Sequence, residues 1–246
     1  MPEPPYRDIH YPLNVFMHIL TKEEGRVANL HYGFFEDANE TIAAAQERST
    51  NELLSRLPPP PARLLDAGSG VGSTLAKLVA RGYDAHGITP DEKQIAIVRS
   101  NYNNVDVQCV RFEDLESSHF DTVIFQESSQ YIDSDALFEK AAEMTSHVVV
   151  LDEFAMQKPS TLHSYDEFIR AATSAGFACT EDVDVTAKAA PTIDYFNIRI
   201  PKYREALVDD LGVRNEQVDD LIGSGIEYRD RYTRGLFVYR VMQFQR

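Results

Sequence analysis

Residues 63–74 read Arg-Leu-Leu-Asp-Ala-Gly-Ser-Gly-Val-Gly-Ser-Thr, and this stretch decides the fold. Two apolar residues lead into Asp66, glycines follow at positions 68, 70 and 72, and residues 75–79 open an apolar helical segment. A buried strand, a tight glycine turn and a helix N-terminus in this order form a nucleotide-type pocket, because glycines let the backbone approach a ligand closely.

The spacing of the glycines separates two classes of ligand. A dinucleotide fingerprint has the pattern Gly-x-Gly-x-x-Gly and places a pyrophosphate at the helix N-terminus. Here the third glycine comes one residue earlier, and an acid stands two residues before the first glycine. The form Asp-x-Gly-x-Gly-x-Gly resembles motif I of the class I S-adenosylmethionine (SAM) methyltransferases. SAM carries an ammonium and a sulfonium but no phosphate, so an acid in the turn suits SAM. The same features disfavour an NAD-dependent dehydrogenase.

This resemblance implies a cofactor, SAM, and a first set of cofactor-binding residues in the turn. They are Asp66, Gly68, Ser69, Gly70 and Gly72.

The composition of the chain limits the classes of protein to which it can belong. The 246 residues are enough for one α/β domain with additions, and 43% of them are hydrophobic. A formal net charge of −15 argues against nucleic acid as a partner, although a few local cations suffice to bind a small anion. With no signal peptide or membrane-length apolar run, the expected location is cytoplasmic. We expect Cys109 and Cys179 to be buried free thiols in a reducing compartment.

Strands alternate with helices along the chain, which predicts an α/β fold: a doubly wound, Rossmann-like, seven-stranded sheet with an antiparallel last strand. N-terminal helices precede it, and a helical insertion precedes the last strand. The expected strands are 63–66, 85–89, 105–110, 122–126, 147–152, 178–186 and 236–243. The expected helices are 15–20, 41–57, 74–81, 91–101, 134–144, 165–175, 203–211 and 216–222.

Three parts are expected from this order. Residues 1–57 form an N-terminal helical lid, and the four prolines at 58–61 mark a rigid joint. Residues 62–186 plus 231–246 form the SAM-binding core. Residues 187–230 form a helical cap over the methyl acceptor, because an insertion of this size in a compact domain is usually functional or disordered.

The second expected strand ends in Gly87-Ile88-Thr89-Pro90-Asp91-Glu92-Lys93-Gln94. This segment resembles the Gly-Ile-Thr-x-Ser-x-x-Gln of a branch that includes cyclopropane fatty acid synthases, tocopherol methyltransferases and geranyl diphosphate C-methyltransferases. The resemblance implies that Thr89 and Gln94 lie near the ribose, where most class I members place an acid. Asp91 is either an N-cap for the next helix or a displaced ribose ligand.

The segment after the third expected strand, residues 111–115, occupies the adenine position of the resembled fold. The resemblance implies that Phe112 contacts the ring. Either Glu113 or Asp114 accepts a hydrogen bond from the adenine amino group, and a solvated acidic turn is the alternative.

The fourth expected strand ends at Gln126 and continues as Glu127-Ser128-Ser129-Gln130-Tyr131. This tail resembles the Glu-Ser-Thr-x-Tyr of geranyl diphosphate methyltransferases. Open α/β sheets bind ligands at the carboxyl ends of their strands, so Gln126 is expected at the cofactor and Glu127 at the reaction centre. Glu127 acts there as a base, as a cation stabiliser or as a SAM ligand, with a helix N-cap as the structural alternative. Tyr131 replaces a histidine of the branch and is expected to shape the pocket.

Two further segments carry candidate residues. His31-Tyr32-Gly33 resembles an aromatic segment that closes over SAM and the acceptor in small-molecule members, so Tyr32 is the third catalytic candidate. The cap carries a basic group at 199–204 that either binds an anionic acceptor or is a solvated helix face. His163 is a weaker candidate for a contact. No metal site is expected.

The function expected from these residues is transfer of a methyl group from SAM to the nitrogen or oxygen of a small metabolite. C-methylation of a prenyl diphosphate or other alkene is the first alternative, favoured by the Glu-Ser-Ser at 127–129. A SAM-binding regulatory protein that transfers nothing is the second. A homodimer is permitted and not required.

Overall fold

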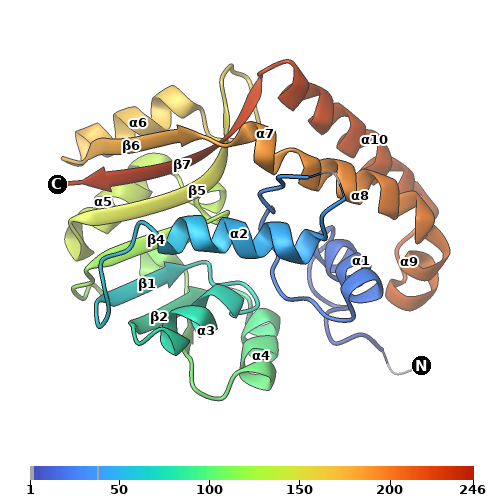
Figure 1. Ribbon diagram of the computed structural model, residues 1–246, viewed down its shortest axis with the longest axis horizontal. Coiled ribbons are helices and arrows are strands. Elements are labelled where there is room, and N and C mark those ends of the chain that lie inside the picture. Colours follow the sequence, from blue (N-terminus) through green and yellow to red (C-terminus); the bar gives the residue numbers. More distant parts are fainter. Residues whose placement is uncertain (1–2, 38) are drawn as a thin grey trace.

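The computed structural model describes residues 3–37 and 39–246. It contains a seven-stranded sheet in the order β3-β2-β1-β4-β5-β7-β6, in which β7 is antiparallel to its neighbours (Figure 1). The predicted sheet and its antiparallel last strand are confirmed. The strands are β1 Arg63–Ala67, β2 Asp84–Thr89, β3 Asp106–Cys109, β4 Thr122–Gln126, β5 His147–Ala155, β6 Ala178–Asp184 and β7 Phe237–Gln245.

Helices cover both faces of the sheet, and ten are described by the structure in residues 3–37 and 39–246. They are α1 Leu13–Glu24, α2 Ile42–Leu54, α3 Ser73–Ala80, α4 Glu92–Asn101, α5 Ser134–Met144, α6 Tyr165–Ser174, α7 Thr186–Ala189, α8 Pro191–Lys202, α9 Arg204–Leu211 and α10 Asn215–Thr233.

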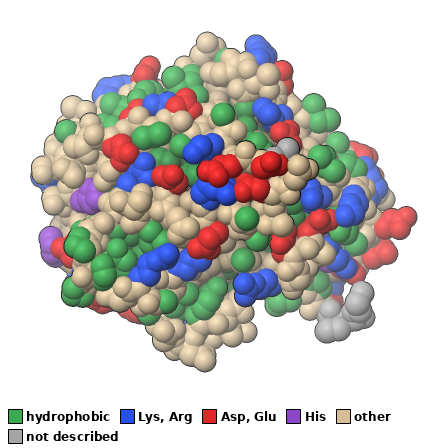
Figure 2. All heavy atoms as spheres, viewed as in Figure 1, with side chains coloured by type: hydrophobic (Ala, Val, Ile, Leu, Met, Phe, Trp, Pro, Cys, Tyr) green, Lys and Arg blue, Asp and Glu red, His purple; other side chains and the backbone are tan. Residues whose placement is uncertain are grey.

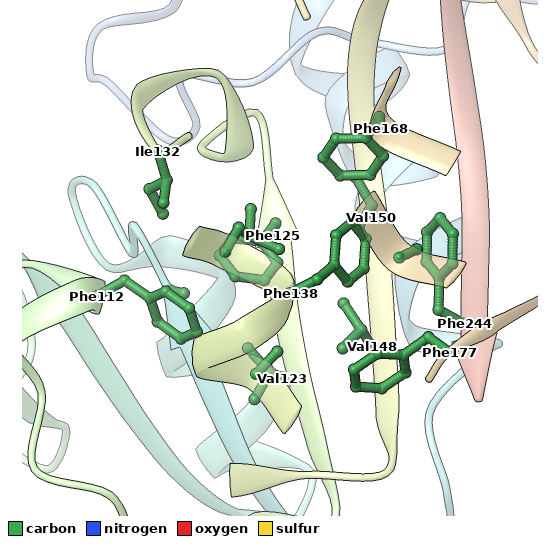
Figure 3. Packing of buried hydrophobic residues seen from close by; sticks show 14 of the residues in the cluster. Phe112, Val123, Phe125, Ile132, Phe138, Val148, Val150, Phe168, Phe177 and Phe244 are labelled. Carbon is green, nitrogen blue, oxygen red and sulfur yellow. The ribbon is translucent and has the colours of Figure 1, made fainter. Parts of the chain in front are cut away.

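The central strands are buried on both faces, as a doubly wound sheet requires. Side chains of a strand alternate between faces, so Val148 and Val150 enter one core while Val149 and Leu151 enter the other. Figure 3 shows the first core, where aromatic rings gather beside these valines. Its rings include Phe138, which packs edge-on against Phe168 with ring centroids 4.9 Å apart. This packing fixes the strand ends that carry the site.

Helices α1, α8, α9 and α10 gather on one side of the molecule, beyond the sheet (Figure 1). Helix α10 packs along α8, and α1 packs against both α8 and α9. Their apolar residues form a third core with Val71 of the glycine turn. The N-terminal segment and the insertion before β7 therefore form one layer over the ligand-binding end of the sheet. Met1, Pro2 and Ala38 of the predicted lid segment lie outside the described residues.

The cysteine prediction is wrong. Cys109 and Cys179 are free but exposed, because they lie on β3 and β6, the two edge strands of the sheet. Edge strands lack a covering neighbour on one side, so an apolar-looking strand context there does not guarantee burial.

Helix α8 was not expected from the sequence, and α10 is longer than the predicted segment 216–222. Helix α8 begins with Pro191 at its first turn, a position that tolerates the missing N–H, but carries Pro201 near its end. The surface shown in Figure 2 mixes acidic and basic side chains without separating them into blocks. No helix among the described residues has both the length and the apolar character needed to cross a membrane.

Candidate cofactor and acceptor site

A cavity of about 1160 Å³ lies where the carboxyl ends of β1, β2, β4 and β5 meet the layer formed by α1, α8 and α10. Residues at the strand ends line its floor, and residues of the helical layer line its roof. This is the position at which open α/β sheets bind ligands. The volume exceeds that of a typical single-ligand pocket, which leaves room for a cofactor and a second small molecule.

The glycine turn forms the wall between β1 and α3. Gly68, Gly70 and Gly72 all have positive φ, which a side chain would strain. A Cβ on Gly68 would lie 2.3 Å from Cβ of Ser128, so the ends of β1 and β4 approach closely only because this residue is glycine. Ser69 is buried, and its N–H donates to the carbonyl of Ile88 at 2.9 Å.

Asp66 is buried to 2% exposure at the carboxyl side of β1, and burial raises its pKa to about 7. Its Oδ2 has no hydrogen-bond partner among the described residues, and neither has the Nε2 of buried Gln126. Gln126 Oε1 accepts from the Thr74 hydroxyl at 2.9 Å, which fixes the amide. Both side chains line a small recess of about 50 Å³ beside the glycine turn.

This recess has the chemistry of an amino-acid site. Asp66 offers a carboxyl to an ammonium group, and Gln126 offers an N–H to a carboxylate. Buried polar atoms without partners are costly unless a ligand or water satisfies them. The residues therefore fit the methionine end of SAM.

Thr89 and Gln94 lie together on the cavity wall, where the Thr89 hydroxyl donates to Gln94 Oε1 at 2.7 Å. Asp91 caps α4, because its Oδ1 accepts from the Lys93 N–H at 2.8 Å. Asp91 also lines the cavity, so the N-cap function and contact with a ligand are compatible at this residue.

Phe112 and Glu113 line the cavity beyond β3, in a short 3-10 helix at Phe112–Asp114. Phe112 is buried with its ring edge-on to Phe125 at 5.1 Å. Glu113 pairs with Arg111 at 2.8 Å. Of the two acids proposed for this position, Glu113 lines the cavity and Asp114 is not among its described lining residues.

Glu127 follows β4 directly and lines the cavity. Among the described residues it is the non-glycine residue with positive φ, at 57°, a conformation that costs energy and occurs preferentially at functional sites. Its Oε1 accepts from the Tyr32 N–H and, at 2.7 Å, from the Tyr239 hydroxyl. Burial raises the pKa of Glu127 well above its ordinary value, and nearby Glu153 adds to the effect.

Glu153 of β5 is a second acid in the cavity, and it is a residue that the sequence analysis missed. It accepts hydrogen bonds from the hydroxyls of Tyr228, at 3.0 Å, and Tyr232, both on α10. Burial raises its pKa to about 7. Tyr32 also lies here: its ring stacks on Tyr239 with centroids 5.5 Å apart, and burial together with the Glu153 charge raises its pKa well above its ordinary value.

A signal for Glu153 existed in the sequence. The expected fifth strand ended at Asp152, and Glu153 follows it as Glu127 follows Gln126. The rule that ligands bind at strand ends applies equally to both acids. Tyr228 and Tyr232 are four residues apart and therefore share one face of a helix, but nothing in the sequence places that face over β5.

Tyr131 and His163 are less central than the sequence suggested. Tyr131 lines the cavity rim and is 77% exposed. The two ring nitrogens of His163 lie 2.9 Å from the Ser129 carbonyl and 3.2 Å from the Ser134 hydroxyl, contacts that position a loop.

The basic group of the cap binds other parts of the protein. Arg199 and Lys202 both pair with Glu23 of α1, at 3.1 and 2.6 Å, and Arg204 pairs with Asp219. None of these three cations is among the described residues that line the cavity. Arg199 and Lys202 thus support the contact between lid and cap, Arg204 forms a pair within the cap, and the expectation that these cations bind an anionic acceptor is not supported. The described residues contain no group of three potential ligands arranged for a metal.

Comparison with known proteins agrees with this geometry. Residues 64–149 match the family model of a methyltransferase domain, a range that contains the glycine turn, Thr89, Phe112 and Glu127. An O-methyltransferase from Pyrenophora dematioidea is 42% identical over 79 residues, which are 30% of this chain and 29% of that protein. The match thus spans less than a third of the relative's length.

Two solved structures share the fold over the whole chain. The cyclopropane synthase MmaA2 from Mycobacterium tuberculosis is 14% identical with a TM-score of 0.80, covering 100% of this chain and 99% of that one. The 4+2 cyclase SpnF is 19% identical with a TM-score of 0.79, covering 100% and 98%. The chain therefore has the Rossmann-like fold of these methyltransferase-type structures, and residues 64–149 are similar to a methyltransferase domain. Because a cyclase shares this fold, the fold alone does not define the reaction.

Proposed function

We propose that this protein is a SAM-dependent methyltransferase that methylates the nitrogen or oxygen of a small molecule. The observation that carries this proposal is the unpartnered carboxyl oxygen of Asp66 in the recess beside the glycine turn. A buried acid without a partner calls for a cationic group, and the larger cavity continues from this recess toward Glu127.

Each wall of the cavity has an assigned role in this proposal. Asp66 and Gln126 hold the amino-acid end of SAM, with Gly68, Ser69, Gly70 and Gly72 giving it room. Thr89 and Gln94 hold the ribose, while Phe112 and Glu113 contact the adenine. The lid, residues 1–57, and the cap, residues 187–230, cover the acceptor and exclude water.

Bound SAM supplies a methyl group that is already activated by the positive sulfur. The protein has to hold the acceptor atom in line with that methyl and receive the acceptor's proton. Glu127 lies at the end of β4 for this purpose, Tyr32 lies beside it through its N–H, and Tyr131 shapes the entrance. A regulatory protein that only binds SAM would not need Glu127 as a proton acceptor.

The test is incubation with SAM labelled in its methyl group and a small-molecule fraction from cells. We expect a labelled small molecule, and we expect Asp66→Asn to lower its yield because SAM affinity falls about 10- to 100-fold. An unchanged SAM affinity in Asp66→Asn would remove the observation on which the proposal rests.

A further inference from the structure

The two ends of the cavity differ in charge. Its basic lining residues lie toward β2 and β3 and are engaged there: Lys93 donates to the Asp8 carbonyl, and Arg111 pairs with Glu113. Three acids, Asp91, Glu92 and Glu113, line that end as well. The end at β4 and β5 carries three acids, Glu127, Asp152 and Glu153, with no lysine or arginine among its described lining residues. Strand β1 separates β2 from β4, so the two ends lie on different parts of the sheet.

All three acids have neutral hydrogen-bond partners only. Asp152 is satisfied by the N–H and the hydroxyl of Ser129, at 3.0 and 2.6 Å. Glu127 and Glu153 accept from a backbone N–H and from tyrosine hydroxyls, and in the part of the chain that the structure describes neither forms an ion pair. A buried carboxylate without a cation is expensive, so a cationic ligand gains from entering here.

Tyrosine rings complete this end of the cavity. Tyr32 joins the two acids, because its N–H donates to Glu127 while its side chain lies beside Glu153. Tyr228 lines the cavity with Tyr32, and its hydroxyl donates to Glu153. Aromatic faces attract cations, with the strongest effect where water is excluded.

We propose that the acceptor is an amine whose protonated nitrogen binds between Glu127 and Glu153, and that Glu153 takes its proton before methylation. This inference rests on the proposed function, since it names the acceptor class of the same site. It goes beyond the sequence resemblance, which left nitrogen, oxygen and carbon acceptors open.

The proton and the electrons balance in this step. The ammonium gives one proton to the Glu153 carboxylate and becomes a neutral amine with a free electron pair. That pair forms the new N–C bond with the methyl group while the S–C bond breaks, and its electrons remain on the sulfur of S-adenosylhomocysteine. The methylated product carries the positive charge that the sulfonium carried before.

An acidic pocket discriminates against the alternatives. An ionised phenol or carboxylate entering here meets the like charge of ionised Glu153, which lowers its affinity. A neutral alcohol lacks the charge attraction that an ammonium gains. Burial holds the pKa of Glu153 at about 7, in the range in which a carboxyl both accepts and releases a proton near neutral pH.

The experiment uses three probes of matched shape: phenethylamine, phenethyl alcohol and hydrocinnamate, which are cationic, neutral and anionic. Each is titrated calorimetrically into the full chain saturated with S-adenosylhomocysteine near neutral pH. We expect the amine to bind about tenfold or more tighter than the alcohol, and hydrocinnamate to bind more weakly than either. Glu153→Gln and Glu127→Gln should each reduce the preference for the amine.

Glu92→Gln is the matched control, because Glu92 also lines the cavity but lies at the β2 end. It should leave the preference unchanged, and thermal melting checks that each variant is folded. Equal binding of amine and alcohol, or a preference that survives Glu153→Gln, would overturn the inference. The inference would also be overturned if the variants weaken the binding of SAM and leave the binding of S-adenosylhomocysteine and of the amine unchanged. The acids would then stabilise the sulfonium of SAM.

Failure of the proposed function gives a different result. If the protein binds neither SAM nor S-adenosylhomocysteine, the methyltransferase proposal falls. The charge preference of the cavity is then measured on the ligand-free protein with the same probes and variants.

Discussion

At the scale of single residues, Asp66 is the side chain on which cofactor binding depends most. Its carboxyl is buried, its pKa is raised to about 7 by burial, and one oxygen has no partner among the described residues. An ammonium at this position supplies the missing partner and favours the ionised carboxylate. In the free protein the Asp66 carboxyl is protonated below neutral pH, and in the complex with SAM it loses this proton.

Asp66→Asn is therefore expected to weaken SAM binding about 10- to 100-fold, because a hydrogen bond to a charged group contributes roughly 1.5–3 kcal/mol. The amide keeps the size of the side chain, and the melting temperature should stay close to that of the unchanged protein or rise, since a costly buried acid is removed. Calorimetry with SAM measures the loss. Unchanged affinity in a folded variant would place the ammonium elsewhere.

The same carboxyl predicts a pH dependence. Since binding requires ionised Asp66, SAM affinity should rise with pH up to about 7. It should fall again above about 7.7, where a free α-amino group loses its proton. Calorimetry across this range should show this maximum, and Asp66→Asn should lose the rise on the acid side. Affinity that falls steadily from low pH would contradict the assignment.

Roles of single residues could be predicted from the sequence where one type of side chain has one use. Glycines at alternate positions after an acid are typical of a turn that binds a ligand. A role in cofactor binding could therefore be predicted for Asp66 and Gly70 from the sequence. For Glu153 the sequence held only its place after the expected fifth strand, because its partners, the hydroxyls of Tyr228 and Tyr232, lie on a helix about 75 residues away in the chain. The role of Glu127 also depends on contacts, with Tyr32 and Tyr239, that the sequence does not place together.

At the scale of elements, the glycine turn between β1 and α3 sets the distance between backbone and ligand. Gly70 has φ of 54°, and a Cβ there would point into space with only the Gly68 carbonyl at 4.0 Å. Gly25, the cap of α1, has φ of 76° and likewise open space around a Cβ. The two glycines thus share the backbone conformation and differ in whether they line the cavity.

Gly70→Ala and Gly25→Ala should each destabilise the protein by about 1–2 kcal/mol through the left-handed backbone. Only Gly70→Ala should in addition weaken SAM, because its methyl group occupies ligand space. Thermal melting and calorimetry on both variants separate the two effects. Equal SAM affinity in the two variants would mean that the turn does not contact the cofactor.

Elements with a strong periodic pattern and a cap were predicted well. The bounds of β4 and α5 agree with the expectation, and α5 has Asp133 as its N-cap. Helix α8 was missed because Pro201 in its last turn and its alternating apolar residues resemble a loop. Its helical form depends on packing against α10 and α1, which the local sequence does not encode.

At the scale of the whole molecule, Glu23 is one of the residues that connect the N-terminal segment to the insertion before β7. Glu23 of α1 pairs with Arg199 and Lys202 and accepts from the Tyr203 hydroxyl at 2.7 Å. These partners, Lys202 first among them, lower the pKa of Glu23 to about 2. A lowered pKa means that the contribution to stability is present above the ordinary value of 4.5 and is lost as the pH falls from there toward 2.

Glu23→Gln is expected to loosen α1 from α8 with a small effect on global stability, below about 1 kcal/mol, because the ion pairs are near the surface. Hydrogen exchange should become faster in residues 13–24 and 191–202, and acceptor probes should bind more weakly while SAM affinity is kept. Glu227→Gln, which breaks an exposed pair with Arg231 on α10, is the control and should change none of these. Unchanged exchange in Glu23→Gln would show that the Glu23 ion pairs do not hold the two parts together.

The central claim, that this fold binds SAM in the glycine-lined cavity, is tested most directly by calorimetric titration of the protein with SAM and, separately, with NAD. We predict saturable binding of SAM at micromolar concentrations and no binding of NAD, because the turn presents a buried acid and lacks the dinucleotide spacing. Binding of NAD, or no binding of SAM, would contradict the account and withdraw the roles assigned to Asp66, Gln126 and Glu127.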